Sequence, residues 1–402
     1  VTALSLAGSD ALICIAGTDL MNAIVDNHEA PMVISSVMKQ NCTERGRRII
    51  ERGMDIAAGS AICRGDKNYL ANPYMSMPIA ITVEGANIMT RSFQIIGQGL
   101  TRCHPYMIDL IQSLQMPKEK EDEAIAIFHK QFYKVVGHGL SNFGASISRG
   151  LNSTFSTAIR SKKAYQDGDK LLDYHEKQLL RLCFTLGGRL KFEELLMGRL
   201  ADALGSIFLG YATLHHYKRR RGIQGLEAIT EHAMLRLEKE AQEALFSASN
   251  NFPGALGPVA STVMKLGCFP LGSVTRPYSE PSDTLSKEVS RLLTTPSELR
   301  DMFAENVYEA PEGVIHQGTD LAKALPVCVE ADKIAKTLRR DNRQPTAAES
   351  DVLNKAEALR DILIQVDVFD HLGLSGTEEK PRPALVGTEE RLANLERKTF
   401  VA

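Results

Sequence analysis

The chain has 402 residues, 44% of them hydrophobic, and a formal net charge of −2 at neutral pH. A chain of this length buries a sizeable core and folds as two or three units. The near-neutral balance excludes the global basic field that nucleic-acid binding requires. Ala, Leu, Glu, Lys, Arg and Met are abundant, Trp is absent and strand-like alternation is scarce, so we expect an all-α fold.

The cysteines are seven in number, widely scattered and without a CxxC pair. Such a set is typical of reduced thiols in a cytoplasm-like compartment and not of a secreted disulfide framework. No signal peptide and no run of about 18 apolar residues is visible, so we expect a cytoplasmic protein. The uncharged segment 244–264 has two interpretations. In the leading interpretation, the segment forms a pair of buried helices broken by a loop. In the other, it lies peripherally on the inner face of the plasma membrane.

Two helices are predicted near the start of the chain. The first, over 3–25, is apolar on most sides and therefore expects cover from its neighbours. Because the sequence begins inside this helix, we expect the natural protein to begin further upstream. The second helix, over 32–59, carries Gly46 and Gly53 on its apolar stripe, which suggests close approach of another helix or a ligand. It ends in the small residues 57–62, which form either an ordinary glycine C-cap or a site for a phosphate-bearing ligand.

A lone carboxylate, Glu84, follows the uncharged apolar run 78–83 and precedes Gly85. A helix is predicted from 87 to 115, with interruptions at glycines and a proline. Glu84 either caps this helix, where negative charge is favourable, or acts as a general base. The apolar run predicts poor solvation, which raises the pKa of a carboxyl group.

A second helical region is predicted beyond the charged linker 117–123. Its strongest helix, over 195–217, presents an apolar stripe that is typical of a core helix. The basic run 215–221 that ends it either closes the helix, the leading interpretation, or binds CoA phosphates or anionic lipid. Further helices are predicted over 284–293, 296–306, 319–340 and 346–365.

Four motifs in order, at 55–62, 68–70, 81–88 and 97–105, resemble those of an acyl-CoA dehydrogenase. The resemblance is to the C-terminal portion of the large bacterial long-chain type, which carries an extra helical tail. Motifs at 186–191, 251–253 and 281–283 extend the resemblance over most of the chain. It implies a helical bundle over 1–116, the C-terminal helical domain, and a mostly helical extension over 117–402. A further boundary is predicted near 252–281, where Pro and Gly cluster.

The resemblance implies FAD-dependent α,β-dehydrogenation of an acyl-CoA, of long chain, to the trans-2-enoyl-CoA in fatty-acid β-oxidation. The resemblance implies that Glu84 is the base that removes the α-proton. Gly85, Ala86 and Ile88 would lie beside the flavin of FAD. Its adenine dinucleotide part would meet residues of a neighbouring subunit, which implies a homo-oligomer. These residues are Asp55, Ala57, Ala58 and Gly59. The implied electron acceptor is electron-transfer flavoprotein or a similar protein.

Two departures from the family pattern lead to an alternative. Ala58 stands where the family usually has glycine, and no counterpart of the family's N-terminal helical domain or middle β domain is found. The alternative is therefore a catalytically inactive, truncated helical module that retains interaction and oligomerisation surfaces. No metal-binding motif is found, and the glycine patterns fail the P-loop and dinucleotide fingerprints.

Overall fold

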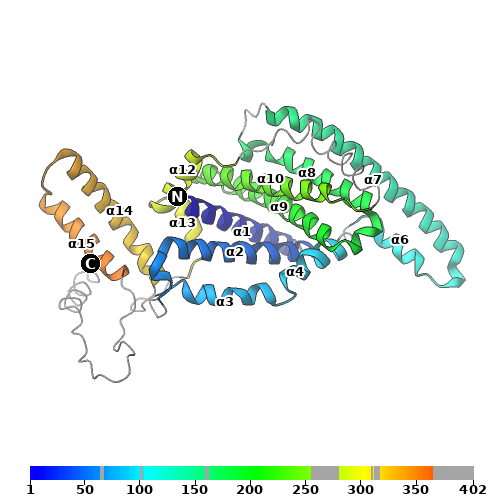
Figure 1. Ribbon diagram of the computed structural model, residues 1–402, viewed down its shortest axis with the longest axis horizontal. Coiled ribbons are helices and arrows are strands. Elements are labelled where there is room, and N and C mark those ends of the chain that lie inside the picture. Colours follow the sequence, from blue (N-terminus) through cyan, green and yellow to red (C-terminus); the bar gives the residue numbers. More distant parts are fainter. Residues whose placement is uncertain are drawn as a thin grey trace, which may run out of the picture. The chain divides into compact units, whose positions relative to one another are not determined.

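The computed structural model describes most of the chain, and every element in the described part is a helix (Figure 1). This confirms the predicted all-α fold. Contacts group the chain into two compact units, a first unit (Val1–Ile49 and Ser76–Arg291) and a second unit (Ile50–Met75 and Leu292–Ala402). The described residues are 1–63, 68–99, 102, 104–158, 163–254, 280–308, 311 and 317–364.

The described part of the chain consists of α-helices and shorter 3₁₀- and π-helices. In chain order they are α1 (Thr2–Asp26), α2 (Ile34–Ala57), η1 (Ala58–Ala61), α3 (Ala71–Thr82), α4 (Asn87–Met89), η2 (Thr90–Gln98), α6 (Met107–Leu114), η3 (Lys118–Lys120), α7 (Glu121–Ala158), α8 (Ala164–Leu186), η4 (Gly187–Phe192), α9 (Glu194–Arg219), α10 (Leu226–Asn250), α12 (Asp283–Thr294), α13 (Glu298–Ala304), α14 (Gln317–Asp341) and α15 (Ala347–Leu363).

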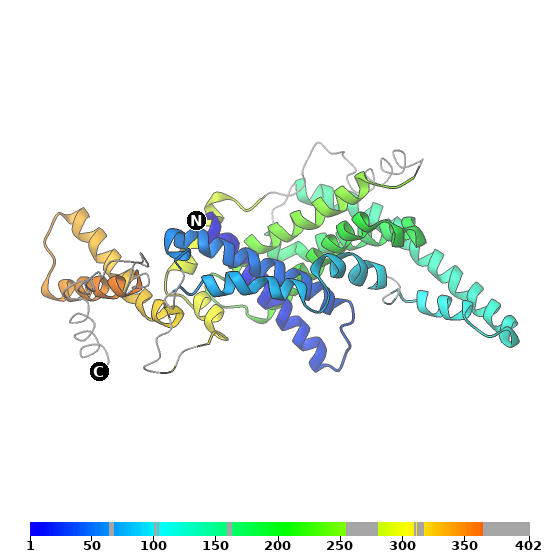
Figure 2. The same cartoon turned by 60° about the horizontal axis from the view of Figure 1, so that its bottom comes forward.

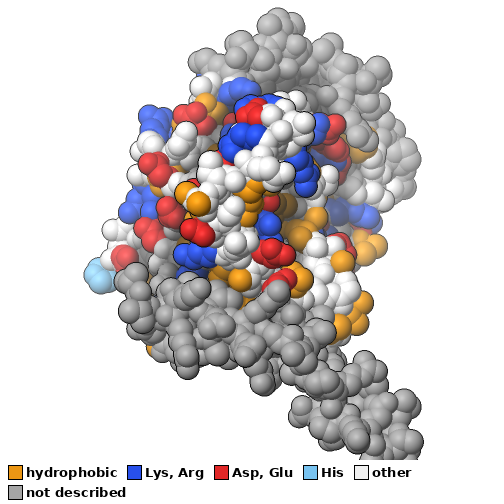
Figure 3. Space-filling view, turned by 90° about the vertical axis from the view of Figure 1, so that its left-hand side faces the viewer, with side chains coloured by type: hydrophobic (Ala, Val, Ile, Leu, Met, Phe, Trp, Pro, Cys, Tyr) orange, Lys and Arg blue, Asp and Glu red, His pale blue; other side chains and the backbone are white. Residues whose placement is uncertain are grey.

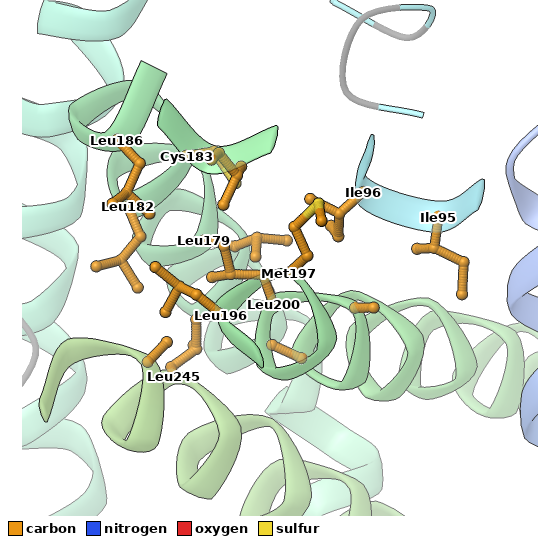
Figure 4. Close-up of a cluster of buried hydrophobic side chains, with 14 of the residues drawn as sticks. Ile95, Ile96, Leu179, Leu182, Cys183, Leu186, Leu196, Met197, Leu200 and Leu245 are labelled. Carbon is orange, nitrogen blue, oxygen red and sulfur yellow. The ribbon is translucent and has the colours of Figure 1, made fainter. Parts of the chain in front are cut away.

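The first unit is built around α9, which packs against α10, α8, α1 and η2 (Figures 1 and 2). The core joins Leu182 of α8, Leu200 of α9, Leu245 of α10 and Ile96 of η2, all nearly inaccessible to solvent (Figure 4). Helix α9 is the predicted helix 195–217, and its burial confirms that the apolar stripe belongs to the core. Helices α1 and α9 have the length and hydropathy of membrane-spanning helices. Both contribute to this bundle, as core helices of that composition do.

The predicted helix over 87–115 is divided into three pieces. After the single turn α4, η2 is a π-helix, and α6 follows beyond Pro105. A π-helix is wider than an α-helix and is frequent at functional sites. The predicted linker 117–123 is wrong, because η3 and the first turn of α7 occupy it. Three acidic residues begin α7, where they favour helix formation by interaction with the helix dipole.

In the second unit, α14 packs against α15. Helix α15 begins with a capping box, in which Glu349 N donates to Thr346 Oγ1 and Thr346 N donates to Glu349 Oε2. Both helices agree with the predictions for 319–340 and 346–365. Figure 3 shows a face on which basic and acidic side chains are interspersed, as expected for a net charge of −2.

The compact units do not follow the predicted domain boundary between 116 and 117, since α6 packs against α7 within the first unit. That division remains a prediction from the family resemblance. Most of the predicted sub-boundary at 252–281, and the second half of the 244–264 segment, lie outside the described residues.

Candidate active site

The uncharged apolar run before Glu84 belongs to a helix, α3, which was not predicted from the sequence. Pro73 lies in the first turn of α3, where its missing N–H removes no helical hydrogen bond. Pro78 lies further inside the helix. Helix α3 packs closely on α2, since a Cβ on Gly46 would lie 2.8 Å from Met77 Cε. This confirms the close helix approach expected at Gly46.

Glu84 lies in the turn between α3 and α4. Its φ is +55° and that of Gly85 is +97°, so two successive residues adopt the left-handed region. For a residue with a Cβ this conformation costs about 1–2 kcal/mol, and such strain clusters at functional sites. The surrounding structure must therefore hold Glu84 in place.

The capping interpretation of Glu84 is wrong. The N-cap of α4 is Ala86, and no side chain caps that helix. The Glu84 side chain is exposed and has no hydrogen-bond or ion-pair partner among the described residues. The predicted poor solvation is not found within this unit either, because Glu84 is exposed and the apolar run folds as α3, none of whose residues is buried.

Lys39 of α2 holds the turn in place. Its ammonium donates three hydrogen bonds, to Ile81 O at 3.1 Å, Gly85 O at 2.7 Å and Asn87 Oδ1 at 2.7 Å. These use all three donors of the group. Gly85 O also accepts a bond from Thr90 Oγ1 at 3.1 Å. The end of α3, the turn and the start of α4 are thus joined to one side chain.

Asn87 completes this arrangement from the other side. Its Nδ2 donates to Thr43 Oγ1 at 2.9 Å and to Glu44 Oε1 at 3.0 Å, both on α2. Sequence reasoning missed Lys39 and the role of Asn87. The available signal was weak, since Lys39 is one cation among many on α2 and lies more than forty positions from the turn.

A cavity of about 270 Å³ lies beside the turn, between the start of α2 and η2. Its volume is just below the range usual for small-molecule sites. Gln94 connects the two features, because it lines the cavity and a Cβ on Gly85 would lie 3.0 Å from its Nε2. The lining residues are Met32, Val33, Ser36, Met89, Phe93, Gln94, Gln98, Gly99 and Arg102.

Large apolar side chains near the turn are exposed. Ile88 is 78% accessible, and Ile79, Val83, Met89 and Phe93 are each about half accessible or more. Exposed apolar surface next to a cavity marks a ligand or protein interface. Ile88 and Ala86, which the resemblance placed beside a flavin, belong to this surface.

The other predicted cofactor residues lie in the second unit, where α2 ends at Ala57. Ala58 has a φ of +52°, so the left-handed residue after the helix is Ala58 and not Gly59, as a glycine C-cap would require. Asp55, Ala58 and Gly59 are exposed, and a Cβ on Gly59 would meet open space. The backbone of this segment is therefore accessible to a phosphate-bearing ligand.

Asn68 stabilises the same segment. Its Nδ2 donates to the carbonyl oxygens of Ser60, Ala61 and Cys63 at 2.7–3.2 Å. Its Oδ1 accepts hydrogen bonds from Leu70 N and Ala71 N at the start of α3. One buried amide thus fixes the turn after Ala58, which explains why Asn68 follows the 55–62 motif.

The family model described as acyl-CoA dehydrogenase, C-terminal, bacterial type, matches residues 101–359. This stretch includes α6 to α10 and extends into α15, and it covers more than half of the chain. Glu84 and the segment 55–59 precede it. The extended helical region after the Glu84 turn is therefore that of the bacterial type, and the chain belongs to the acyl-CoA dehydrogenase family as its bacterial-type C-terminal region.

Proposed function

We propose that this chain is the C-terminal part of an enzyme that dehydrogenates acyl-CoA at the α and β carbons, with Glu84 as the base. The observation that carries the proposal is the Glu84 turn. An exposed carboxylate without a partner occupies a left-handed conformation, and three hydrogen bonds from Lys39 hold that turn in place. Backbone strain of this kind clusters at functional sites.

The chemistry requires a base that becomes poorly solvated when the substrate binds. An α-proton of a thioester is weakly acidic, and desolvation raises the pKa of a carboxyl group towards the working range. The exposed apolar side chains of Val83, Ile88 and Met89 would provide a dry environment once an acyl chain covers them. A correctly placed base contributes about 10²–10⁴-fold to the rate.

The residues present fit FAD as the cofactor. Gly85, Ala86 and Ile88 would lie beside the flavin, and its adenine dinucleotide part would meet the backbone of Ala57, Ala58 and Gly59, together with Asp55, of a neighbouring subunit. FAD supplies the acceptor for the β-hydride. The protein residues orient the acyl-CoA, exclude water and hold the α-proton on a Glu84 carboxylate oxygen.

The remaining parts of the proposal come from the family. They are a long-chain acyl-CoA as substrate, fatty-acid β-oxidation as the process, electron-transfer flavoprotein or a similar protein as electron acceptor, and a homo-oligomer. We propose a cytoplasmic location with peripheral contact to the inner face of the plasma membrane. The cavity beside η2 supports a ligand next to the turn, and its volume fits a part of such a ligand.

The test is flavin binding and turnover by the purified chain. FAD is titrated into the protein while flavin absorbance is recorded, and dehydrogenation of palmitoyl-CoA is followed with an artificial electron acceptor. Glu84→Gln should lower turnover by at least about 10²-fold and leave the flavin spectrum unchanged. Glu29→Gln, an exposed acid in the turn between α1 and α2, is the matched control and should retain turnover.

Two results would contradict the proposal. Retained turnover in Glu84→Gln removes Glu84 from the chemistry. A protein that stays colourless with excess FAD and does not turn over favours the alternative of an inactive helical module for interaction and oligomerisation.

A further inference from the structure

Helices α6 and α7 form a hairpin that extends beyond the bundle of α8, α9 and α10 in the first unit (Figures 1 and 2). The second half of α7 packs on α8, where Gly139 lies against the Phe184 ring and a Cβ would not fit. The first half packs on α6, where Gln131 Nε2 donates to Asp109 Oδ2 at 3.0 Å. A two-helix hairpin covers one side of each helix, so the opposite side of the first half of α7 stays open among the described residues of this unit.

The open side of α7 carries a line of residues at alternating intervals of four and three. Such spacing keeps side chains on one face of a helix and is the pattern of helices that pair with one another. Tyr133 is 71% accessible and Leu140 62%, and a Cβ on the neighbouring Gly137 would meet open space. Ile125 and Phe132 flank the line and are about half accessible. We call this line the α7 seam; it consists of Asp122, Ala126, His129, Tyr133, Val136 and Leu140, all exposed except the half-buried Val136.

Opposite charges follow one another along the first half of α7. Three acids begin the helix, and Lys130 follows about two turns later. Asp122, Glu123 and Lys130 have no ion-pair partner among the described residues. Two copies of α7 that cross antiparallel about a two-fold axis at Ala126 bring these charges together, because positions equally far on either side of the axis face each other. Asp122 then faces Lys130 of the second copy, and Glu123 faces His129 of the second copy.

The residues near this axis suit an interface. Ala126 has the smallest side chain of the α7 seam, so two helices can approach closely there. The two-fold symmetry repeats both charge contacts, and the exposed side chains of Ile125 and Tyr133 lie beside them on the helix. Exposed apolar surface of this kind marks a site of interaction, and complementary charges around it fix the register of the partner.

We propose that the α7 seam is an interface between two copies of this chain, which pair antiparallel about a two-fold axis at Ala126. The partner is a second copy and not a lipid surface, because the hairpin tip at 117–123 carries four acids and two lysines and repels anionic headgroups. This interface goes beyond the proposed function, since it uses neither the Glu84 turn nor the segment 55–59 that the resemblance assigns to contact with a neighbouring subunit.

A cross-link at the axis tests the pairing in the full chain. Ala126→Cys places two thiols side by side when the α7 helices pair, and a short bis-maleimide should join them. Peptide mass spectrometry should then find the peptide that contains position 126 linked to a second copy of itself. Ser141→Cys is the matched control, because this exposed position of α7 would lie about 45 Å from its counterpart and should give no such link.

Charge reversal in the Ala126→Cys background tests the register. Lys130→Glu places two acids opposite each other and should lower the cross-link yield at least about threefold, at a protein concentration that gives half-maximal yield. Asp122→Lys alone should have a similar effect. The two substitutions together should restore the yield, because the charges are then exchanged. This rescue excludes misfolding as the cause, since a second charged substitution would not restore a variant that fails to fold.

Two results would overturn the proposal. The first is a yield at position 126 no greater than at position 141, or a loss of yield that the exchanged charges do not restore. The second is flotation of the unmodified chain with vesicles of phosphatidylcholine and phosphatidylglycerol that Tyr133→Ser abolishes, without a link at position 126. That result would assign the α7 seam to a membrane.

Discussion

The Lys39 ammonium lies 2.7 Å from Gly85 O, so a side chain of α2 supports the carbonyl that follows Glu84. The same ammonium also reaches Ile81 O and Asn87 Oδ1. A turn with two successive left-handed residues has no helical hydrogen bonds of its own to stabilise it. Lys39 therefore supplies three of the hydrogen bonds that stabilise this turn, and Thr90 Oγ1 supplies another to Gly85 O.

Replacement of Lys39 by Met tests that contribution. The variant keeps the aliphatic stem but removes three hydrogen bonds, and we expect the free energy of unfolding to fall by about 1–3 kcal/mol. Chemical denaturation measures the change. Lys170→Met, at an exposed position of α8, is the control and should change stability by less than about 0.5 kcal/mol. Equal effects of the two variants would show that the turn does not depend on Lys39.

Ala57 and Ala58 are adjacent residues with opposite backbone requirements. Ala58 has a φ of +52°, whereas Ala57 has a φ of −75° in the helical region. We expect Ala58→Gly to stabilise the protein by about 1 kcal/mol, because glycine adopts the left-handed region without strain. Ala57→Gly should destabilise it by about 0.5–1 kcal/mol. Thermal unfolding of the pair measures both signs, and a common sign would refute the backbone argument.

The buried ion cluster around Asp10 in the first unit predicts a large loss of stability when Asp10 is replaced. Asp10 is completely buried and accepts from Arg45 at 2.6 Å and Arg236 at 2.9 Å. Asp10→Ala should destabilise the protein by about 3–5 kcal/mol, since two guanidinium groups lose a buried partner. The comparison is Asp332→Ala, which removes the exposed pair with Arg360 and should cost less than about 1 kcal/mol. Denaturation midpoints compare the two.

The burial of His175 predicts a dependence of stability on pH. Desolvation lowers the pKa of His175 to about 3 in the folded protein, whereas an unfolded histidine has a pKa near 6.5. Between these values the unfolded chain binds more protons, so stability is complete above about pH 6.5 and falls as the pH decreases towards 3. This one group contributes at most about 1.4 kcal/mol per pH unit.

His175→Leu should remove that contribution. Urea denaturation between pH 4 and pH 8 should show a shallower slope for the variant below about pH 6.5 and parallel curves above it. Identical slopes in the acidic range would contradict neutral burial of His175.

The prediction of helices from sequence succeeded where the signal is local. Apolar residues at helical spacing identified α1, α2, α9 and α12 to α15 to within a few residues. Helix α3 was missed because prolines in the apolar run disfavour a helix locally. The packing of Gly46 against Met77, which joins α2 to α3, offsets that unfavourable preference. The motif at 81–88, in which Glu84 lies between the apolar run and Gly85, was also recognised from the sequence.

The state of Glu84 depends on residues far away in the chain. Its left-handed backbone, its exposed carboxylate and the support from Lys39 follow from how α2 and α3 meet. The left-handed conformation of Ala58, in a segment that Asn68 stabilises, likewise depends on contacts that local sequence patterns do not report. Periodicity reports which face of a helix is apolar, and this determines the helices and the family motifs. Hydrogen bonds across many residues decide backbone conformation and solvent exposure, and only the tertiary structure contains them.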